Sequence, residues 1–217
     1  MLEFDEDTHT YTVNGKVLKG TTDLISDFFE PFNEEYWAGF VAKKEGKSPQ
    51  EIKELWEKKR TDACEYGTMI HKVIEDYLDD INQGAPNELI EAVDFLSEYI
   101  GLEIVSEMQL YDVEWLVAGT IDIVIDTPEG VYLVDWKTSK EIKYDNKYQK
   151  GLKELSHLDD CNYIRYSLQL GVYKALYEKT NNKKVIGTAI IKLTKEGKYQ
   201  FIPTLDLKKE VAYMLTS

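Results

Sequence analysis

Residues 114–137, EWLVAGTIDIVIDTPEGVYLVDWK, decide how the fold of this chain is interpreted. Two runs within them, 114–126 and 130–137, are rich in Val, Ile and aromatic residues, a composition typical of β-strands. The turn residues 127–130, Thr-Pro-Glu-Gly, separate the two runs, so we expect a β-hairpin. An earlier apolar run, 102–110, predicts a third consecutive strand before the hairpin.

Two aspartates interrupt these apolar strand runs. A carboxylate inside such a run is costly unless it is paired, hydrogen-bonded or bound to a metal ion, and this applies to both Asp122 and Asp135. Asp135 and Lys137 lie two residues apart, so in a strand they face the same side while Trp136 points away. Pairing of the hairpin would bring Asp122 close to Asp135. Carboxylate oxygens beside an ammonium group suit Mg²⁺ or Mn²⁺ with a phosphate nearby.

Hydrolysis of a phosphodiester has two requirements that this set of residues would meet. A metal ion held by the carboxylates lowers the pKa of a bound water and polarises a phosphoryl oxygen. Lys137 could orient or deprotonate that water, or stabilise the negative charge of the transition state. A salt bridge between Lys137 and either aspartate at the end of a sheet is the alternative explanation of the same triplet.

Two helical segments add further candidates. His71 and Glu75 are one helical turn apart, so the imidazole could serve as a metal ligand with Glu75 orienting it. Gln169 and Tyr173 also have i,i+4 spacing and could contact the substrate backbone or position the lysine. Each pair is also compatible with an ordinary structural role.

The N-terminal third predicts a hairpin followed by helices. Residues 9–18 alternate around Asn14-Gly15, a signal for a type I′ hairpin. Thr21 or Thr22 can cap a short helix that Pro31 ends.

A helix-rich stretch follows over residues 33–81, with a break at 46–49. Ser48 is placed as an N-cap, with Pro49 at the first helical position and Glu51 at the third, which predicts a capping box. After another break around 83–86, residues 87–100 predict a helix.

The remainder of the chain alternates between helices and strands. Residues 141–158 have little periodicity and predict a mobile loop or irregular segment. Apolar residues at helical spacing predict a helix over 160–180 that ends at Asn181-Asn182. Two strands are predicted at 185–193 and 199–202, joined by a turn at Glu196-Gly197. A final helix is predicted at 207–215. We therefore expect an α/β fold with a central mixed sheet flanked by helices, in one domain of residues 1–217. Within that domain we distinguish an N-terminal hairpin and short helix at 1–32, a helical region at 33–100 and a core at 101–217.

Composition limits the possible functions. The 217 residues are 43% hydrophobic and 30% charged, as in globular proteins, and contain neither an apolar run long enough to span a membrane nor a signal peptide. Two cysteines cannot hold a four-cysteine iron–sulfur cluster, and they favour a reducing, cytoplasmic setting. The net charge of −14 argues against tight non-specific binding of nucleic acid, although a local groove can still be basic. It also makes small acidic metabolites unsuitable substrates.

Four motifs in order resemble the RecB-like branch of the PD-(D/E)XK nuclease superfamily: GTMIHKVIE at 67–75, GTID at 119–122, VDWKTS at 134–139 and QLGVY at 169–173. The opening hairpin with TTDLI at 21–25 is similar to phage-type exonucleases of that branch and to the mitochondrial genome-maintenance exonuclease. This resemblance implies a restriction-endonuclease-like core that works with Mg²⁺ or Mn²⁺ on DNA.

The resemblance also implies roles for individual residues. His71, Asp122 and Asp135 become metal ligands, joined by the backbone carbonyl of Trp136, and Lys137 becomes the catalytic lysine. Gln169 and Tyr173 belong to the helical motif of the family, and Glu75, Thr138 and Ser139 support the site. Many relatives carry a glutamate on the strand before the first catalytic aspartate. Glu107 fits that position, with Glu103 as the competing assignment and a solvated strand-edge glutamate as the alternative to both.

The chain departs from parts of the family pattern. No proline precedes Asp122, which follows Ile121 as is common in this branch. The cluster cysteines of some relatives are missing, so we expect no iron–sulfur cluster. A helicase motor and a Walker-type phosphate loop are also missing, so any unwinding must come from a partner.

Three functions remain open at this stage. The first is an exonuclease that acts on DNA ends or single strands in recombination, repair or replication. We expect it in a bacterial or phage-infected cell. Its partners could include a helicase, a single-strand-binding protein or an annealing protein, and it could form oligomers. Its candidate base-stacking residues are Tyr36, Trp37, Trp56 and Tyr66, and its candidate phosphate contacts are Lys43, Lys44, Lys47, Lys58, Lys59, Arg60, Lys140, Lys143, Lys147 and Lys150. The second is a structure-specific endonuclease on the same core, and the third is a catalytically silent DNA-binding or assembly module.

Overall fold

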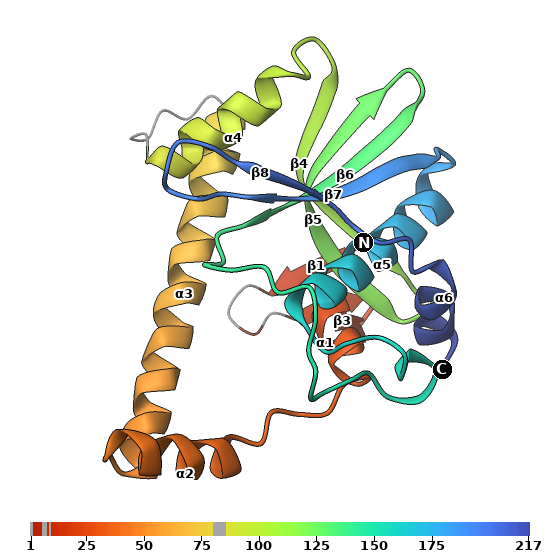
Figure 1. The fold of residues 1–217 in the computed structure, drawn as a ribbon. Coiled ribbons are helices and arrows are strands. Elements are labelled where there is room, and N and C mark those ends of the chain that lie inside the picture. The colour runs from red at the N-terminus through yellow and green to blue at the C-terminus, as the bar shows by residue number, and fades with distance from the viewer. Residues whose placement is uncertain (1, 6–7, 9, 80–85) are drawn as a thin grey trace.

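The computed structural model describes residues 2–5, 8, 10–79 and 86–217, and it builds them around one mixed β-sheet (Figure 1). The strands are β1 (Leu2–Asp5), β2 (Thr10–Val13), β3 (Lys16–Gly20), β4 (Glu103–Asp112), β5 (Val117–Thr127), β6 (Gly130–Lys137), β7 (Val185–Lys192) and β8 (Gln200–Pro203). The helices are α1 (Thr21–Ser26), α2 (Glu34–Glu45), α3 (Pro49–Leu78), α4 (Asn87–Ser97), α5 (Asn162–Asn181) and α6 (Lys208–Thr216), with one 3₁₀ turn, η1 (Lys153–Leu155).

The sheet combines antiparallel and parallel pairs. Its strand order is β1-β2-β3-β5-β6-β7-β8, with β4 paired to the other edge of β5. β4, β5 and β6 pair antiparallel in succession, whereas β3 pairs with β5 and β6 with β7 in parallel. This arrangement confirms the predicted α/β class with a central mixed sheet.

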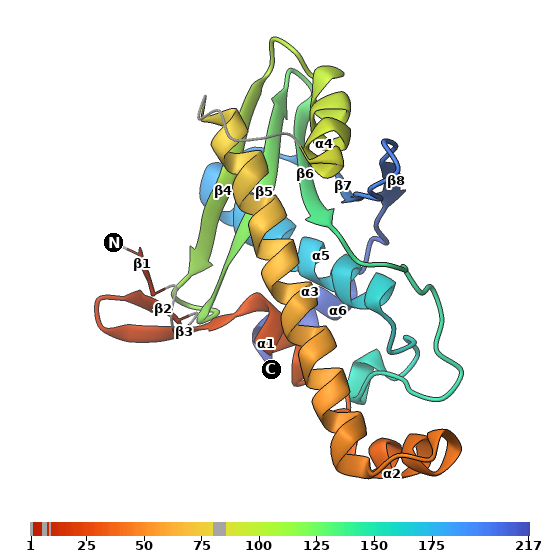
Figure 2. The same ribbon diagram turned by 90° about the vertical axis from the view of Figure 1, so that its left-hand side faces the viewer.

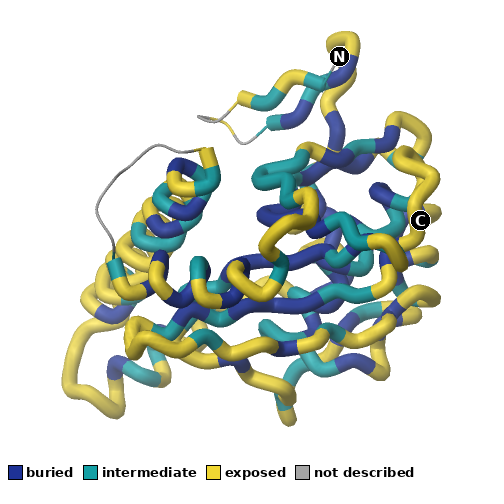
Figure 3. Tube along the Cα trace, turned by 90° about the horizontal axis from the view of Figure 1, so that it is seen from above, coloured by how far each residue is buried: buried dark blue, intermediate teal, exposed yellow. Residues whose placement is uncertain are grey.

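Helices cover both faces of the sheet, as Figures 1 and 2 show. One face packs on α5, α6 and α1 through a core that includes Ile121, Leu168 and Leu170. The other face packs on α4 and the C-terminal half of α3 through a core that includes Phe95 and Trp136. In the view of Figure 3, the buried residues gather along the central strands and the helix faces that contact them.

The N-terminal hairpin forms as predicted, because Asn14 and Gly15 both take the positive φ angles that a type I′ turn requires. The sequence did not indicate β1, which adds a further antiparallel strand to β2. His9 of the predicted hairpin lies outside the described residues.

The predicted threonine cap of the first helix is wrong. Gly20 occupies the N-cap of α1, and no side chain caps the helix. The Thr21 hydroxyl instead donates to the carbonyl of Ala118 on β5 at 3.0 Å. A contact with a distant strand therefore uses the hydroxyl that the local sequence pattern had assigned to capping the helix. The helix also ends at Ser26, before Pro31.

The helical region consists of a hairpin of helices, α2 and α3, followed by α4. Ser48 caps α3 with the predicted box: its hydroxyl accepts from the Glu51 amide, while the Glu51 side chain accepts from the Ser48 amide. α3 then runs for 30 residues, so its outer half and α2 extend away from the sheet (Figure 2). The predicted helix end at Ile81 and most of the break around 83–86 lie outside the described residues.

The C-terminal half follows the predicted order. The segment between β6 and α5 is irregular apart from η1, yet it buries Ile142, Leu155 and Leu158. Asn182 ends α5 in the left-handed conformation, and Gly197, also at positive φ, lies in the turn between β7 and β8. None of the helices in the described part of the chain is long and apolar enough to cross a membrane.

Candidate metal centre and active site

Asp122 lies where strands β5 and β6 separate. The antiparallel pairing of these strands stops at Ile123 and Val134. Beyond that point the Trp136 amide donates to the Asp122 side chain, with 2.7 Å between N and Oδ2, so the carboxylate takes the place of a backbone acceptor. This hydrogen bond helps to hold an aspartate that is only 7% exposed.

The side-chain alternation of β5 reverses at the same residue. Ile121 contributes to the core under α5, whereas Ile123, two residues later, contributes to the core under α3 and α4. In a regular strand these two side chains would share a face. On the neighbouring strand β4, Glu107 lies between the residues paired with Ile121 and Ile123 and has a φ of +48°, which is unusual for a residue other than glycine. The distortion of both strands places their carboxylates side by side.

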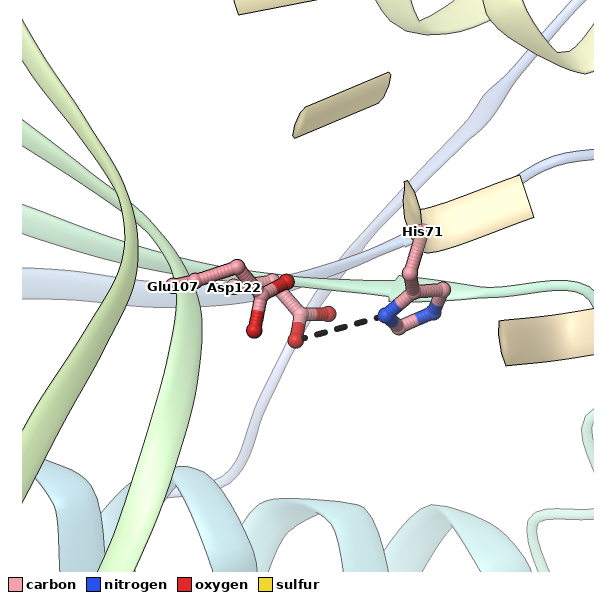
Figure 4. Close-up of side chains that lie close together, drawn as sticks. All are labelled: His71, Glu107 and Asp122. Carbon is pink, nitrogen blue, oxygen red and sulfur yellow. Dashed lines mark ion pairs between the residues drawn. The ribbon is translucent and has the colours of Figure 1, made fainter. Parts of the chain in front are cut away.

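His71 reaches this point from α3 (Figure 4). Its Nδ1 lies 3.5 Å from Oδ1 of Asp122. One ligand atom each from His71, Glu107 and Asp122 lie within 4.8 Å of one another, which is close enough for all three to bind one cation. The helix and two strands of the sheet therefore converge on a single candidate metal centre.

Asp135 and Lys137 form an adjoining ion pair on β6. Both project from the same side of the strand, while Trp136 is buried in the opposite core against Phe95 with 5.7 Å between ring centroids. The Oδ2 atom of Asp135 is buried, and among the described residues the Lys137 ammonium is its one partner. A carboxylate oxygen in this state still has capacity for a cation.

The Asp122 carboxylate and the His71 ring stabilise each other's charged forms. Burial alone would raise the pKa of Asp122, but the charge and hydrogen bonding of His71 outweigh it and lower that pKa. Burial likewise works to lower the pKa of His71, while Asp122 raises it to about 9 overall. Without a metal ion, His71 is therefore protonated at neutral pH.

The pKa values of the other two carboxyl groups, those of Glu107 and Asp135, are raised. Burial, followed by the charge of Asp122, raises the pKa of Glu107 to about 7. Burial also raises the pKa of Asp135 to about 6, although Lys137 pulls in the opposite direction. Three neighbouring carboxyl groups with little water around them carry an electrostatic cost that a bound cation would remove.

The residues of α5 flank the lysine. The Lys137 Nζ lies 4.8 Å from the centroid of the Tyr166 ring, a cation–π contact. Gln169 donates from Nε2 to the hydroxyl of Tyr173 at 3.0 Å. Tyr173 is buried, which raises its pKa, and Asp135 and Asp122 lie close enough to add to that effect. Both residues of the predicted helical pair therefore lie beside the carboxylates.

The remaining predicted residues occupy less direct positions. The carboxylate of Glu75 pairs with Lys72 at 2.9 Å, one turn away from His71. A Cβ at Gly67 would lie 3.5 Å from the Thr138 hydroxyl, so Thr138 faces α3. The hydroxyl of Ser139 is buried without a hydrogen-bond partner among the described residues. Of the two competing glutamates, Glu107 lies at the centre, whereas Glu103 is exposed.

Sequence reasoning missed two tyrosines near the site. Tyr166 had no assigned role, although its position three residues before Gln169 places it on a similar side of α5. Tyr11, from the N-terminal hairpin, bonds through its hydroxyl to that of Thr120 at 3.1 Å, and Glu107 affects its pKa. The contact spans 109 positions of sequence, so no local pattern could have indicated it.

The donor set fits a divalent cation. Carboxylate oxygens with one imidazole nitrogen are ligands that Mn²⁺ accepts, and Mg²⁺ favours the oxygens. The buried Asp135 carboxylate lies beside Lys137, and the backbone carbonyl of Trp136 is adjacent to it in the chain. The candidate ligands are therefore His71, Glu107, Asp122, Asp135 and the Trp136 carbonyl.

Two solved structures show distant similarity to this chain. A protein from Eubacterium rectale, assigned provisionally as an exonuclease, is 16% identical with a TM-score of 0.37, and the match covers 86% of this chain and 65% of that one. The chain therefore spans less than two thirds of the length of that protein. The protein SSO0001 is 13% identical with a TM-score of 0.31, with 68% of each chain covered. The sequence matches no curated protein.

A family model gives the decisive comparison. The model that describes the PD-(D/E)XK nuclease superfamily matches residues 97–214, which is more than half of the chain. The matched range contains β4, β5, β6 and α5, and every candidate site residue except His71 and Glu75 lies within it. The chain belongs to the PD-(D/E)XK nuclease superfamily.

Proposed function

We propose that this protein is a Mg²⁺- or Mn²⁺-dependent deoxyribonuclease that acts as an exonuclease on DNA ends or single strands. The observation that carries the proposal is the convergence of His71, Glu107 and Asp122 beside the Asp135–Lys137 pair. Nucleases of this superfamily use divalent metal ions, and DNA is their implied substrate. We further propose that residues 1–217 act as one nuclease domain.

His71, Asp122, Asp135 and the Trp136 carbonyl would hold the metal ion, with Glu107 placed to hold a second ion or a water. When bound, the ion supplies a more acidic water and polarises the phosphoryl group. The carboxylates orient the ion, and the hydrogen bond from the Trp136 amide keeps Asp122 in place.

Lys137 would stabilise the negative charge that develops on the phosphoryl oxygens. Burial works to lower its pKa, but Asp135 and Asp122 outweigh burial and raise it, so the side chain is a cation at neutral pH. A charged ammonium cannot accept a proton from water, which favours charge stabilisation over general base catalysis among the roles open to this residue. Tyr166 and the Gln169–Tyr173 pair would position the lysine and the scissile phosphate.

Exposed aromatic side chains support an unpaired strand as substrate. Phe32, Tyr36, Trp37 and Phe40 are exposed on α2 and the segment before it, and Tyr36 reaches 63% exposure. Aromatic rings in contact with solvent can stack on bases of any sequence, and stacking requires that those bases are not paired. Two earlier candidates fit less well, because Trp56 packs against Phe32 and Tyr66 donates its hydroxyl hydrogen to Glu88.

Basic residues around this surface could contact the phosphates. Lys43 and Lys44 end α2, and the exposed Lys58 and Lys59 lie along α3. Others are neutralised, since Lys47 pairs with Glu45, Arg60 with Glu57 and Lys150 with Asp159. The net charge of −14 weakens binding through phosphates alone, which favours a substrate held by its bases as well.

Product analysis tests the proposal. The purified protein would be incubated with Mn²⁺ or Mg²⁺ and three DNA substrates: linear single strands, linear duplex and closed single-stranded circles. We expect the linear single strand to be shortened progressively while the circles stay intact, and we expect Asp135→Asn to abolish cleavage. A parallel RNA strand would test the choice of sugar.

Each alternative has its own outcome. Cleavage of closed circles would establish an endonuclease and reject the exonuclease assignment. Absence of cleavage of every substrate by the unmodified protein, with Mn²⁺ shown to bind, would establish a catalytically silent module. Lys209→Ala, which alters an exposed lysine on α6, serves as the control for variants.

A further inference from the structure

A cavity of about 570 Å³ lies beside the proposed active site, between the segment that joins α1 to α2, the chain at Leu152 and the first half of α5. Its apolar lining comes from Phe29, Pro31, Phe32 and Leu152, and its polar lining from Ser26, Asp27, Glu30 and Arg165. The volume lies within the range of small-ligand pockets.

The walls of the cavity are fixed by specific contacts. Phe29 forms a bridge with Gly151, and the Leu152 amide donates to the Phe28 carbonyl at 2.8 Å. The Arg165 guanidinium lies 4.3 Å from the centroid of the Phe29 ring and donates through Nε to Asp160 at 2.7 Å. The buried Phe29 ring and Asp160 therefore hold the flat Arg165 guanidinium in place before any ligand arrives.

One side of the cavity is open, so a DNA strand could enter there. Phe29 is buried, whereas Phe32 is 57% exposed and has its edge against Trp56 with 5.7 Å between centroids. A planar ligand entering along Phe32 would exchange exposed aromatic surface for a stacked contact.

The chemistry of the lining favours a nucleobase over a phosphate. Glu30 places an exposed carboxylate in the lining, which repels phosphate groups, while the carboxylate of Asp27 is paired with Lys19. Carboxylates accept hydrogen bonds from the exocyclic amines of bases, and aromatic and guanidinium planes stack on base faces. Each property of the lining thus matches the edge or the face of a base, while the sugar–phosphate backbone would stay outside.

The cavity and the proposed catalytic residues share the helix α5, since Arg165 lines the cavity. Arg165 lies four residues before Gln169, so the two share one side of the helix. It also adjoins Tyr166, whose ring is in contact with Lys137. A single strand whose phosphate is at Lys137 would reach the cavity within a few nucleotides.

We propose that this cavity is a subsite for one nucleobase of the substrate strand, at a fixed number of nucleotides from the bond that is cut. The proposal rests on the proposed nuclease function. It assigns to Phe32 and Arg165 the task of holding a base, with Phe29 supporting the Arg165 guanidinium, separate from the metal ligands and Lys137.

The test uses single-stranded oligonucleotides that carry one abasic residue, moved one position at a time along the strand. With Mn²⁺ present and enzyme in excess, we expect cleavage by the unmodified protein to slow about 5- to 100-fold when the abasic residue lies at one fixed offset from the cut bond, as loss of one base–aromatic stack would give. Phe32→Ala should slow cleavage of the intact strand to a similar degree and remove the extra effect of the abasic residue. Phe32→Trp should retain both.

Controls separate the possible failures. Phe201→Ala alters a phenylalanine of similar exposure, 51%, on β8, and should cleave like the unmodified protein. Bis(p-nitrophenyl) phosphate, a diester without a base, should be hydrolysed at equal rates by the unmodified protein and Phe32→Ala. Equal rates on every abasic strand, with the diester and intact strands still cleaved, would overturn the subsite alone. No hydrolysis of any diester would instead reject the nuclease function. Because the abasic series needs no variant, misfolding of Phe32→Ala would leave the test intact.

Discussion

The ammonium group of Lys137 has two neighbours of different character, the Asp135 carboxylate and the face of the Tyr166 ring. Both interactions favour the charged form, and both restrict where the group can lie. A cation held in a largely buried position has more influence on a nearby phosphate than a solvated one, because less water screens it. The sequence spacing indicated the pairing with Asp135, but not the tyrosine.

Replacing this charge should affect chemistry more than folding. For Lys137→Met, which keeps a long unbranched side chain, we expect DNA cleavage to fall by about 100- to 1,000-fold, the typical loss when one group that stabilises transition-state charge is removed. Single-turnover cleavage of a linear strand measures the effect, and thermal unfolding checks that the variant is folded. Lys209→Met, on the exposed side of α6, should stay within a factor of two. A Lys137→Met enzyme of normal activity would remove the lysine from the mechanism.

Metal binding should depend steeply on pH because two candidate ligands carry protons at neutrality. Burial and Asp122 together leave the pKa of His71 at about 9, and that of Glu107 is about 7. A metal ion needs both groups deprotonated, so its binding should release protons and tighten between pH 6 and pH 9. Calorimetry with Mn²⁺ in buffers of different ionisation enthalpy measures both quantities. His71→Ala should bind more weakly and lose the dependence above pH 7, whereas a constant affinity over this range would exclude His71 as a ligand.

At the scale of elements, α5 lies against β5 so closely that only glycine fits at position 119. A Cβ there would lie 2.6 Å from the Tyr173 ring and 2.8 Å from the Thr21 hydroxyl. Both neighbours are themselves fixed, Tyr173 by Gln169 and Thr21 by the Ala118 carbonyl. The glycine of the GTID motif therefore sets the distance between the helix and the carboxylates.

Gly119→Ala and Gly39→Ala form a matched pair that tests this packing. We expect Gly119→Ala to lower the free energy of unfolding by roughly 1–3 kcal/mol and to slow DNA cleavage, because Tyr173 must move. Gly39 lies within α2 with open space around its Cα, so Gly39→Ala should raise the free energy of unfolding by about 0.4–1 kcal/mol and leave cleavage of a base-free diester unchanged. Denaturant titration and cleavage assays measure both effects. Equal stability of the two variants would show that α5 can shift without cost.

Elements specified by neighbouring residues were predictable, and those specified by distant ones were not. The Asn14-Gly15 turn and the capping box of Ser48 follow from a few adjacent residues, and both are confirmed. The parallel pairing of β3 with β5 and the Tyr11–Thr120 contact join segments about a hundred residues apart. The reversal of alternation at Asp122 breaks the period that strand prediction relies on, so the sequence indicated which residues form the site but not how the strands turn them together.

For the whole molecule, the buried carboxyl groups make stability depend on pH. The pKa values of Asp135 and Glu107 are raised to about 6 and about 7, so between their ordinary values and these the folded state binds more protons than the unfolded state. Stability therefore falls as the pH rises through this range. His71, whose pKa is raised to about 9, contributes stability that is fully present below pH 6.5 and is lost as the pH rises through 9. All three effects have the same sign.

We therefore expect the metal-free protein to become less stable from pH 5 to pH 9, in thermal unfolding followed by circular dichroism. Mn²⁺ should oppose this loss, adding about 2.7 kcal/mol when its concentration is a hundred times the dissociation constant. Asp122→Asn should weaken the protection. A melting temperature that rises with pH in the presence of a chelator would contradict the assignment of raised pKa values to these groups.

The 30-residue helix α3 has a consequence for the length of DNA that the protein can handle. It carries His71 near one end and Trp56, beside Phe32, near the other, and no proline interrupts it after Pro49. Fifteen residues of helix separate these two points by about 22 Å, a separation that the backbone hydrogen bonds keep constant. If bases are held at Phe32 and the strand is cut beside His71, as we propose, the helix fixes the distance between these two positions. Oligonucleotides too short to span it should bind at one end only, so the protein should leave a short remnant of characteristic size instead of digesting every strand to single nucleotides.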